Sequence, residues 1–529
     1  MADFYYSYKQ WQLTKSKYLN KYSSILLNDS LKIFINENTY TFVEKDKDYV
    51  YLLGYAHTEG CTLVEYLSHL LNRFTIEMVE QIKKELWGQY LLIIKQDESI
   101  YIFSDILQTR SIYYDCKDKV VSSIFSLIHK NDPLEIDDYK LFEFISMRYC
   151  VHPSWLGTDT FDKQIKRIRA NEYLKINLTD GDIQVNQVTI TINNTKASSI
   201  QSLYNETFST LKKVIADPTL KDEVVECTIT GGFDSRLAMT LARKYYKDVN
   251  LRIAKPKGSS FEDYSIAVKI AKMLSKTITI YETDAEQQEG LFFQLTDGLS
   301  PLENIVMTEL FISKPNQKLG IGGVFGTEIY TLPGSNSVED YIHNCLERVK
   351  KNICAEDSYY NKLANSLKES LEYINKYYSL TENNDIDCIR LFFLLHTAQF
   401  NTRFSAGFNL FHRQFEPFGT YPVIEMAFRI PYSHMGSSNT LGRYYYIPKK
   451  IMYNLDPKIA CILTNRYYPM APLNWKTLPT YLKGKYLRKK QKSDNKPIKK
   501  YSLKTKGFQC NEYWIKPLIS VYGLDLSNN

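Results

Sequence analysis

Residues 1 to about 190 alternate short apolar runs with turn residues, a pattern that predicts short strands and few long helices. The runs Tyr90–Ile94 and Ser99–Phe103 flank the polar stretch Lys95–Glu98, which suits the turn of an antiparallel hairpin. Further strands are expected at 31–36, 49–54 and 185–192, and helices near 62–72 and 76–86. This half is therefore expected to have an α+β fold, and Asn193-Asn194-Thr195 marks its expected boundary.

The apolar period changes after Ser198. Apolar residues at spacings of three and four predict an amphipathic helix over 198–216, with Ser198 and Gln201 as its capping box. The pattern then predicts, in order, a strand at 224–230, a helix from Gly231-Gly232 through Tyr245, a strand at 251–254, a helix at 264–274 and a strand at 277–282. Alternating strands and helices of this kind predict a parallel sheet with helices on both faces.

The C-terminal third is apolar first and basic afterwards. Residues 385–461 are mostly helical in pattern and are interrupted by prolines at Pro417, Pro422, Pro431 and Pro448. Lys476 to Lys506 carries twelve Lys and Arg against the single acid Asp494, so this segment contributes +11 to the net charge of +7 and the rest of the chain has −4. We expect residues 476–508 to be a loosely ordered, solvated extension, with an anionic partner as the alternative.

Composition narrows the class of protein. A chain of 529 residues suggests two or three domains at roughly 150 residues each, and 44% hydrophobic residues exclude wholesale disorder. The nine cysteines contain no Cys-x-x-Cys pair, and the eight histidines have no metal-ligand spacing. The start of the chain does not resemble a signal peptide, and no run of ~18 uncharged apolar residues is present, so we expect a cytoplasmic protein without a membrane span.

The clearest chemical motif is Thr230-Gly231-Gly232-Phe233-Asp234-Ser235-Arg236, at the point where a buried strand ends and a helix begins. Two glycines let the backbone approach a ligand, and the free amides at the positive end of a helix can bind a phosphate. Thr230 and Ser235 add hydroxyl donors, and Asp234 can hold a magnesium ion that bridges phosphates. A tight strand-to-helix turn without a ligand is the alternative.

This motif resembles the SGGxDS pyrophosphate loop of the ATP-pyrophosphatase family, with Thr in place of the first Ser. Glu262-Asp263 followed by Ala267 resembles the DExxxA helix of the asparagine synthetase branch, and Gly322–Glu328 resembles its SGxGxDE segment. The later stretch from Pro417-Phe418 to Pro431 is similar to the helical region of the same synthetase domain.

The N-terminal half shows a related resemblance. Gly88-Gln89-Tyr90 and the stretch from Ser104-Asp105 to Tyr114 are similar to the GxF and RDxxGxxxLYY patterns of class II glutaminase domains. Thr158–Leu174 resembles the linker into the synthetase domain. The resemblance implies an Ntn-hydrolase-like α+β domain followed by an α/β domain with a doubly wound parallel sheet, of the adenine nucleotide α-hydrolase type. The expected domains are 1–192, glutaminase-like but degenerate; 193–475, synthetase-like; and 476–529, a basic extension.

Three departures from the family pattern bear on activity. The family's glutaminase nucleophile is a cysteine at the mature N-terminus, whereas position 2 here is Ala and the first cysteine is Cys61, so we expect no glutaminase activity. Thr327 replaces the aspartate expected beside Glu328, so Glu328 either takes over the metal contact or that contact is lost. The family's late lysine is absent, and Arg466 is the cation that could replace it, although a surface arginine is an equal alternative.

The resemblance implies an ATP- and Mg²⁺-dependent ligase that activates a small-molecule or peptide carboxylate and joins it to ammonia or an amine. The implied metal residues are Asp234 and Glu328, and the implied catalytic residues are Glu328 and Arg466. The implied nucleotide-binding residues are Ile229, Thr230, Gly231, Gly232, Asp234, Ser235, Arg236, Ala254, Gly322 and Gly323. Two other functions stay open: a nucleotide-binding pseudoenzyme with an interaction role, and a nucleic-acid-modifying enzyme of the same superfamily.

Overall fold

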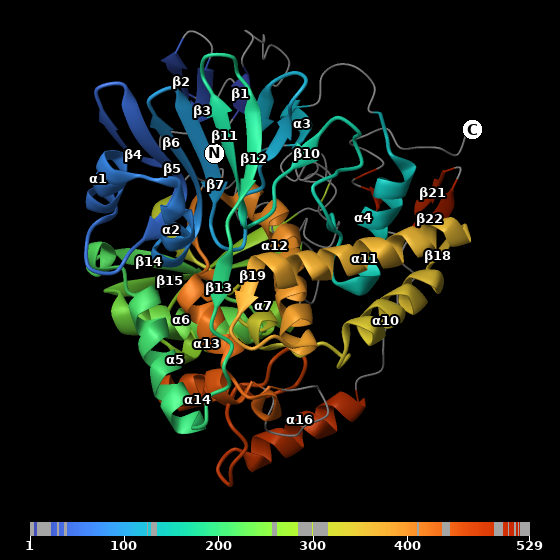
Figure 1. Ribbon diagram of the computed structural model, residues 1–529. Coiled ribbons are helices and arrows are strands. Elements are labelled where there is room, and N and C mark those ends of the chain that lie inside the picture. The colour runs from blue at the N-terminus through green and yellow to red at the C-terminus, as the bar shows by residue number, and fades with distance from the viewer. Residues whose placement is uncertain are drawn as a thin grey trace.

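The computed structural model describes residues 40–123, 125–128, 135–256, 262–283, 299, 316–409, 412–435, 445–490, 501–505, 507–512, 515, 516 and 518 (Figure 1). Before residue 40 it describes the backbone of three strands, β1 (Tyr5–Ser7), β2 (Ser23–Asn28) and β3 (Leu31–Ile35). The expected strand at 31–36 corresponds to β3, which pairs antiparallel with β2.

The N-terminal half is built on an antiparallel sheet of six strands. Their order across the sheet is β12 (Ile183–Gln187), β11 (Glu172–Asn177), β7 (Ser99–Ser104), β6 (Trp87–Gln96), β5 (Asp48–His57) and β4 (Tyr40–Lys45). The predicted hairpin is confirmed as β6 and β7, with Gln96 opposite Ser99, so its turn is only Asp97-Glu98. Asp97 has a φ of 53°, the left-handed conformation that such short turns require.

Both faces of this sheet are buried, which explains the uninterrupted apolar runs in the sequence. Leu52, Leu92 and Ile94 face the helices α1 (Leu63–Arg73) and α2 (Val79–Glu85). Leu53, Leu91 and Ile93 face the opposite layer, where a second small sheet lies. That sheet has the order β1, β9 (Val120–Ser122), β8 (Tyr113–Asp115) and β10 (Lys166–Arg167). Helix α1 begins with the capping box of Thr62 and Glu65.

The second half contains the predicted parallel sheet. Its order is β16 (Ile278–Thr283), β15 (Asp248–Pro256), β14 (Val224–Thr228), β17 (Asn316–Ile321) and β20 (His412–Phe415), and every neighbouring pair is parallel. The chain adds strands outward on one side of β14 and then on the other, so the direction of winding reverses between β14 and β17. In open α/β sheets the crevice at such a reversal is where ligands bind. Strand β20 was not predicted, because its four residues lie within a stretch that is otherwise helical in pattern.

The rest of the described residues consist mainly of helices and the loops between them. The helices are α3 (Phe125–Ile128), α4 (Asp138–Cys150), α5 (Ile200–Ile215), α6 (Asp234–Tyr245), α7 (Glu262–Met273), α10 (Val338–Lys350), α11 (Asp357–Tyr377), α12 (Asp385–Asn409), α13 (Tyr421–Phe428), α14 (Tyr446–Leu455), α15 (Pro457–Ala460) and α16 (Leu478–Lys490). Pro422 and Pro448 lie in the first turns of α13 and α14, where the missing N–H costs no hydrogen bond. Among the described residues, no helix combines the length and apolar character that crossing a bilayer requires.

Three local predictions need correction. Helix α5 begins at Ile200 and is capped by Ser199, whose hydroxyl accepts from the Ser202 amide, so the expected Ser198–Gln201 box is wrong by one residue. The strand expected over 185–192 is two strands. After β12 ends, β13 (Ile190–Ile192) leaves the sheet and pairs in parallel with β19 (Tyr378–Leu380).

The third correction concerns the basic C-terminal segment. Its described part is not loosely ordered, because it forms α16 and then a hairpin of β21 (Tyr501–Lys504) and β22 (Phe508–Glu512). Strand β22 also pairs with β18 (Ile353–Ala355), which anchors the segment to the body of the protein. Leu503, Phe508 and Cys510 are buried there, so a few apolar residues among many lysines are sufficient to hold the hairpin.

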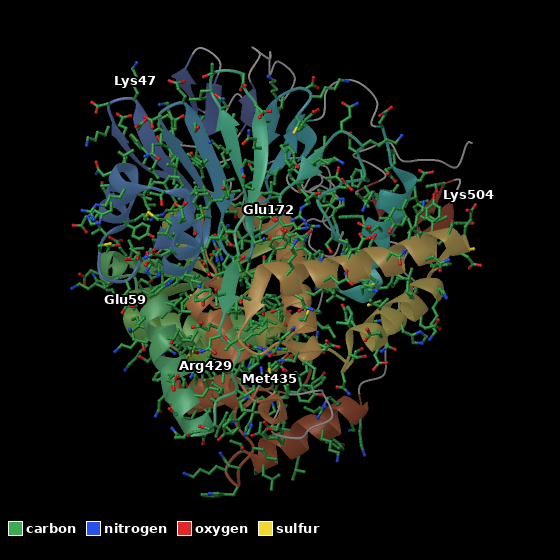
Figure 2. The ribbon with its side chains drawn as sticks, viewed as in Figure 1. Lys47, Glu59, Glu172, Arg429, Met435 and Lys504 are labelled. Carbon is green, nitrogen blue, oxygen red and sulfur yellow. The ribbon has the colours of Figure 1, made fainter. Side chains whose placement is uncertain are left out.

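The two halves are joined by direct side-chain contacts, and side chains fill the region between them (Figure 2). Tyr55 donates to Asp217 over 2.7 Å, and the rings of Tyr55 and His57 pack against Phe415 of β20. On another side of the interface, Tyr373 of α11 donates to Glu172, the first residue of β11, over 2.9 Å. The carboxyl edge of the parallel sheet is therefore fixed against the N-terminal half.

Candidate functional site

The loop Thr230–Ser235 connects β14, the central strand of the parallel sheet, to α6. The side chains of Thr230 and Ser235 link the two ends of the loop. The Thr230 amide donates to Ser235 Oγ over 3.1 Å, and Thr230 Oγ1 lies 2.9 Å from Ser235 Oγ. The Gly232 amide donates to Thr230 Oγ1 over 3.1 Å. The result is a compact turn at the positive end of α6, at the edge where the direction of winding reverses.

Two charged residues, Asp263 and Arg236, bind the backbone of this loop. Asp263, at the start of α7, accepts from the Gly231 amide over 2.9 Å. Arg236 is fully buried and donates to the Gly231 carbonyl over 2.6 Å and to the carbonyls of Ile462 and Leu463. The guanidinium of Arg236, predicted to bind nucleotide, is thus used to brace the loop. Asp263 was singled out in the sequence only as part of a helix motif, and its contact with Gly231 is a long-range one.

The segment Gly322–Glu328 follows β17 and lies directly against this loop. Gly323 packs on the backbone at the start of α6, where a methyl group in its place would lie 2.5 Å from the Ser235 amide nitrogen. A methyl group at Gly326 would lie 3.0 Å from Cβ and Oδ1 of Asp234. Thr327 Oγ1 donates to Asp234 Oδ2 over 3.0 Å. The structure therefore brings together two segments that the sequence identified separately, and glycines make their close approach possible.

Asp234 and Glu328 form a carboxylate pair that is electrostatically strained. Burial, then the charge of Glu328, raises the pKa of Asp234 well above its ordinary value, although the Thr327 hydroxyl and the Arg466 charge oppose this. Burial also raises the pKa of Glu328. Asp234 Oδ1 is buried and has no hydrogen-bond partner in the structure. A bound cation would satisfy this oxygen and relieve the repulsion between the two carboxylates.

The donor set fits a magnesium ion that is shared with phosphates. No group of three or more His, Cys, Asp or Glu side chains among the described residues is arranged to hold a metal ion. Mg²⁺ in phosphate-transfer sites is commonly held by one or two carboxylates, with the remaining ligands supplied by phosphate oxygens and water. Asp234 and Glu328 match that arrangement and do not match a site built by protein side chains alone.

Glu416 is a site residue that sequence reasoning missed. It is buried, and its carboxylate accepts from the Val324 amide over 2.8 Å and from Gln414 Nε2 over 2.9 Å. Its backbone amide donates to Gln89 Oε1 over 2.6 Å, and Gln89 Nε2 donates back to its carbonyl. Burial raises the pKa of Glu416 to about 7. Because Glu416 fills the space beside Gly322, it fixes the second segment and connects it to β6 of the N-terminal half.

The other predicted residues are distributed around the same sheet edge. Ile229 follows β14 and Ala254 lies in the neighbouring β15, both buried at the carboxyl ends of these strands, and the Ile229 amide donates to the Arg252 carbonyl. Arg466 is exposed in the loop after α15, and its positive charge partly opposes the rise in the pKa of Asp234. The adjacent Asn465 amide donates to the Gly231 carbonyl over 3.2 Å, which ties this third segment to the first.

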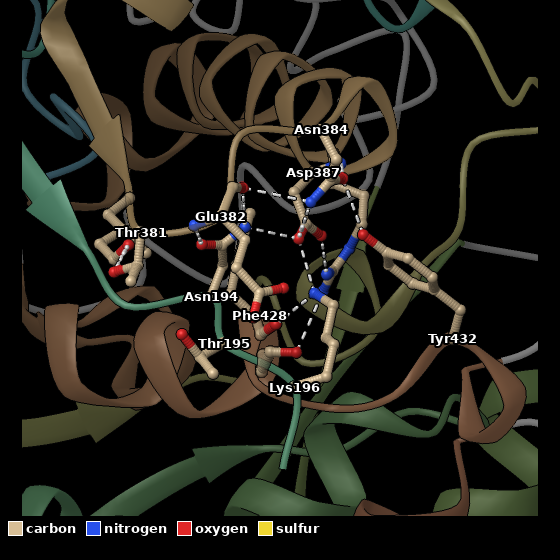
Figure 3. Close-up of polar contacts among 12 residues, drawn as sticks. Asn194, Thr195, Lys196, Thr381, Glu382, Asn384, Asp387, Phe428 and Tyr432 are labelled. Atoms are coloured by element: carbon tan, nitrogen blue, oxygen red, sulfur yellow. Dashed lines mark hydrogen bonds and ion pairs between the residues drawn. The ribbon is translucent and has the colours of Figure 1, made fainter. Parts of the chain in front are cut away.

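A buried ion-pair network around Asp387 (Figure 3) contacts the backbone next to Glu328. Arg390 of α12 donates to Asp387 over 2.7 Å and to the carbonyl of Ile329, the neighbour of Glu328, over 2.9 Å. Asp387 also accepts from Asn194 and from Lys196, over 2.9 and 2.6 Å. Burial would raise the pKa of Asp387, but the cations Arg390 and Lys196 outweigh it and hold that pKa below its ordinary value.

Among the described residues of the N-terminal half, no cysteine has the lowered pKa that a nucleophilic thiol requires. Cys61, the first cysteine of the chain, is exposed, and burial together with Glu65 and Glu85 raises its pKa, which disfavours the nucleophilic thiolate. The first residues of the chain, where the family's nucleophile would lie, are outside the described residues.

No protein-family model and no curated protein matches the chain. Among solved structures it matches a glutamine phosphoribosylpyrophosphate amidotransferase from B. subtilis complexed with ADP and GMP, with 12% identity over 48% of this chain and 74% of that one. It also matches a glutamine-dependent NAD+ synthetase from Acinetobacter baumannii in complex with ADP, with 12% identity over 36% of this chain and 41% of that one. A third match is the allosteric regulatory enzyme of purine biosynthesis, with 13% identity over 49% and 73%. All three TM-scores are 0.19, so these similarities carry no argument about the fold or activity of this chain.

Proposed function

We propose that the protein is an ATP-dependent, amide-forming ligase that resembles asparagine synthetase and acts in the cytoplasm. An oxygen of a substrate carboxylate attacks the α-phosphorus of ATP, and the bond to the β-phosphate breaks to release pyrophosphate. Ammonia or an amine then attacks the acyl carbon of the acyl-adenylate, loses a proton and displaces AMP. In this proposal residues 1–192 form a degenerate glutaminase-like domain of Ntn-hydrolase type, 193–475 the adenine nucleotide α-hydrolase-like synthetase domain, and 476–529 a basic extension.

One observation carries the proposal: three segments that are distant in sequence meet at the carboxyl edge of the parallel sheet. They are the Thr230–Ser235 loop, the Gly322–Glu328 segment and the loop of Arg466, joined by the Thr327–Asp234 hydrogen bond and by the contact of the Asn465 amide with Gly231. The meeting point combines the positive end of a helix, a carboxylate pair and a cation. A site that binds and activates a nucleotide requires these three kinds of group.

Each residue has a role in this proposal. The loop of Thr230, Gly231, Gly232 and Ser235, with Gly322 and Gly323 beside it, would receive the pyrophosphate. The loop amides that donate to Ser235, Asp263 and Thr230 would exchange those partners for phosphate oxygens. Ile229 and Ala254 would flank the adenine. Asp234 and Glu328 would hold Mg²⁺, which when bound supplies positive charge to the phosphates. Arg466 would stabilise negative charge that develops during acyl transfer, while Arg236 positions the loop.

Backbone conformation adds independent support for the family resemblance. Gln108 and Phe325 stand at positions where the RDxxG and SGxGxDE patterns have glycine. Both have left-handed backbones, with φ of 53° and 73°, and they are two of only eight non-glycine residues with positive φ among the described residues. Such conformations cost side-chain-bearing residues about 1–3 kcal/mol, so their presence at these two positions indicates that the glycine-dependent turns have been kept.

A second function, a nucleotide-binding pseudoenzyme, is favoured by Thr327. Its hydroxyl group donates a hydrogen bond to Asp234 Oδ2 and lies 3.4 Å from a Glu328 oxygen. The family pattern has a third carboxylate at this position. A site with this substitution would keep the phosphate cradle and lose one metal contact. It would bind nucleotide without turning it over.

Pyrophosphate release separates the two functions. Wild type is incubated with MgATP, an amine or ammonia, and a panel of carboxylates, and is compared with Asp234→Asn and Glu328→Gln. Asp222→Asn and Glu339→Gln, which remove exposed acids outside the site, serve as matched controls. We expect carboxylate-dependent release that is lost in the first two variants and kept in the controls. MgATP binding by calorimetry without release for any carboxylate would instead support the pseudoenzyme, and no binding would refute both.

A further inference from the structure

Helix α16 has one face packed on the body of the protein. Tyr481 is buried and donates to the Ala471 carbonyl over 2.6 Å, and the Arg488 guanidinium stacks 3.9 Å from the centre of the Tyr468 ring. Gly484 lies against the Tyr467 carbonyl, with no room for a side chain. The helix is therefore held in place by its inner face, next to the loop that carries Arg466.

The outer face of the same helix carries a row of exposed apolar residues. Leu478, Leu482 and Tyr486 are four residues apart and lie on one face, and Trp475 precedes the helix by three residues. These four residues, which we call the α16 stripe, are between 43% and 80% exposed. They are half of the exposed large hydrophobic residues found among the described residues. Single exposed apolar residues are ordinary, whereas a cluster of this kind marks an interaction surface.

Positive charge surrounds the α16 stripe. Residues 476–490 contain six basic residues and no acid: Lys476, Lys483, Lys485, Arg488, Lys489 and Lys490. At helical spacing Lys485 falls on one side of the stripe, and Lys483 and Lys490 fall on the other. Outside residues 476–506 the chain has a net charge of −4, so an anionic surface would attract this end of the molecule and repel the rest.

We propose that the α16 stripe docks on the surface of an anionic lipid membrane. Leucine and aromatic side chains would enter the boundary between headgroups and acyl chains, and the flanking lysines would bind lipid phosphates. Two leucines of the stripe provide no ring for stacking on bases, which disfavours single-stranded nucleic acid. A second copy is disfavoured because the lysines of two such helices would face each other with no acid between them.

This docking uses a helix that lies on the membrane and does not cross it. The inner face of α16 stays on the Tyr467 and Tyr468 loop, so this loop, which also carries Arg466, would be held ~10 Å, one helix diameter, from the lipid surface. The proposal concerns this surface alone and holds whether or not the ligase proposal is correct.

Flotation of the full-length protein with vesicles tests the proposal. Vesicles of phosphatidylcholine alone are compared with vesicles that also contain phosphatidylglycerol, at low and high salt. The variants are Leu482→Ser with Tyr486→Ser, and Lys483→Gln with Lys490→Gln, with Val64→Ser as the control because Val64 is equally exposed on the distant α1. Thermal unfolding of every variant should match wild type, since all these side chains point to solvent.

We expect wild type to float with the phosphatidylglycerol vesicles, less so at high salt, and not with phosphatidylcholine alone. Each double variant should weaken this partitioning by about tenfold or more, and Val64→Ser should not. Absence of flotation for wild type, or flotation that neither double variant weakens, would overturn the proposal. Binding to a polyuridylate oligonucleotide without vesicle binding, or a dimer in light scattering that the double variants abolish, would overturn it in favour of those partners.

Discussion

Replacing Gly323 with alanine should push the two central segments of the candidate site apart. A methyl group at Gly323 would lie 2.5 Å from the Ser235 amide nitrogen, whereas ordinary contact begins near 3.4 Å, so one backbone must move by about 1 Å. Backbone atoms lie on both sides of this contact, and neither can rotate away as a flexible side chain could. The displacement acts on the Ser235 amide, on Asp234 and, through Thr327, on Glu328.

The expected cost has two parts. Overpacking of a close contact typically destabilises a protein by about 1–3 kcal/mol. Misplacement of site groups by about 1 Å can cost roughly 10²-fold in turnover. Gly323→Ala should therefore lower the thermal midpoint modestly, weaken MgATP binding in calorimetry, and reduce any carboxylate-dependent pyrophosphate release far more than the loss of stability would suggest.

Gly334→Ala is the matched control. Gly334 follows the same segment, and a methyl group there would meet no atom within 4 Å. This variant should resemble wild type in stability and in nucleotide binding. If Gly323→Ala behaved like Gly334→Ala in all three assays, the close approach of the two segments described above would be wrong.

Three further predictions concern charged residues. Asp387→Asn should destabilise the protein by about 3–5 kcal/mol, because it leaves Arg390 and Lys196 without their counter-charge. A thermal midpoint equal to that of wild type would contradict a stabilising role for this ion-pair network. Burial raises the pKa of Glu416 from 4.5 to about 7. Between these pH values the folded protein keeps a proton that the unfolded chain has released. The free energy of unfolding should therefore fall by up to about 3 kcal/mol as pH rises from 4.5 to 7. Glu416→Gln should flatten this slope in thermal unfolding measured against pH, and an unchanged slope would assign it to other groups. Arg466→Ala should leave stability unchanged, since Arg466 is exposed. Because Arg466 is proposed to act in acyl transfer, the variant should lower the steady-state rate of AMP formation about 10²-fold, with partial recovery in Arg466→Lys. Full activity in Arg466→Ala would remove it from the site.

Local patterns predicted much of the fold. The β6–β7 hairpin, the strand and helix on either side of Gly231-Gly232, and the parallel sheet all depend on apolar periodicity and turn residues that lie close together in the chain. The predicted site segments, Thr230–Ser235 and Gly322–Glu328, do lie together. Whether they bind nucleotide stays a prediction.

The features that sequence reasoning missed depend on contacts between distant residues. Glu416 is important because the Val324 amide donates to its carboxylate and Gln89 accepts from its backbone amide across the fold, and nothing in its immediate sequence indicates this. The C-terminal hairpin was missed because its partner strand β18 lies about 150 residues earlier in the chain, and because the residues just before the hairpin, 476–500, are rich in lysine. Neither feature leaves a periodic pattern in the sequence.

Isotope transfer would test the central claim, carboxylate activation by adenylation, most directly. A carboxylate that supports pyrophosphate release is labelled with ¹⁸O, and the AMP formed with MgATP and an amine is examined by ³¹P nuclear magnetic resonance. Attack of the carboxylate on the α-phosphorus predicts one ¹⁸O atom in the phosphate of AMP and an equal amount of pyrophosphate. Formation of ADP and inorganic phosphate, or AMP without ¹⁸O, would contradict the proposed function.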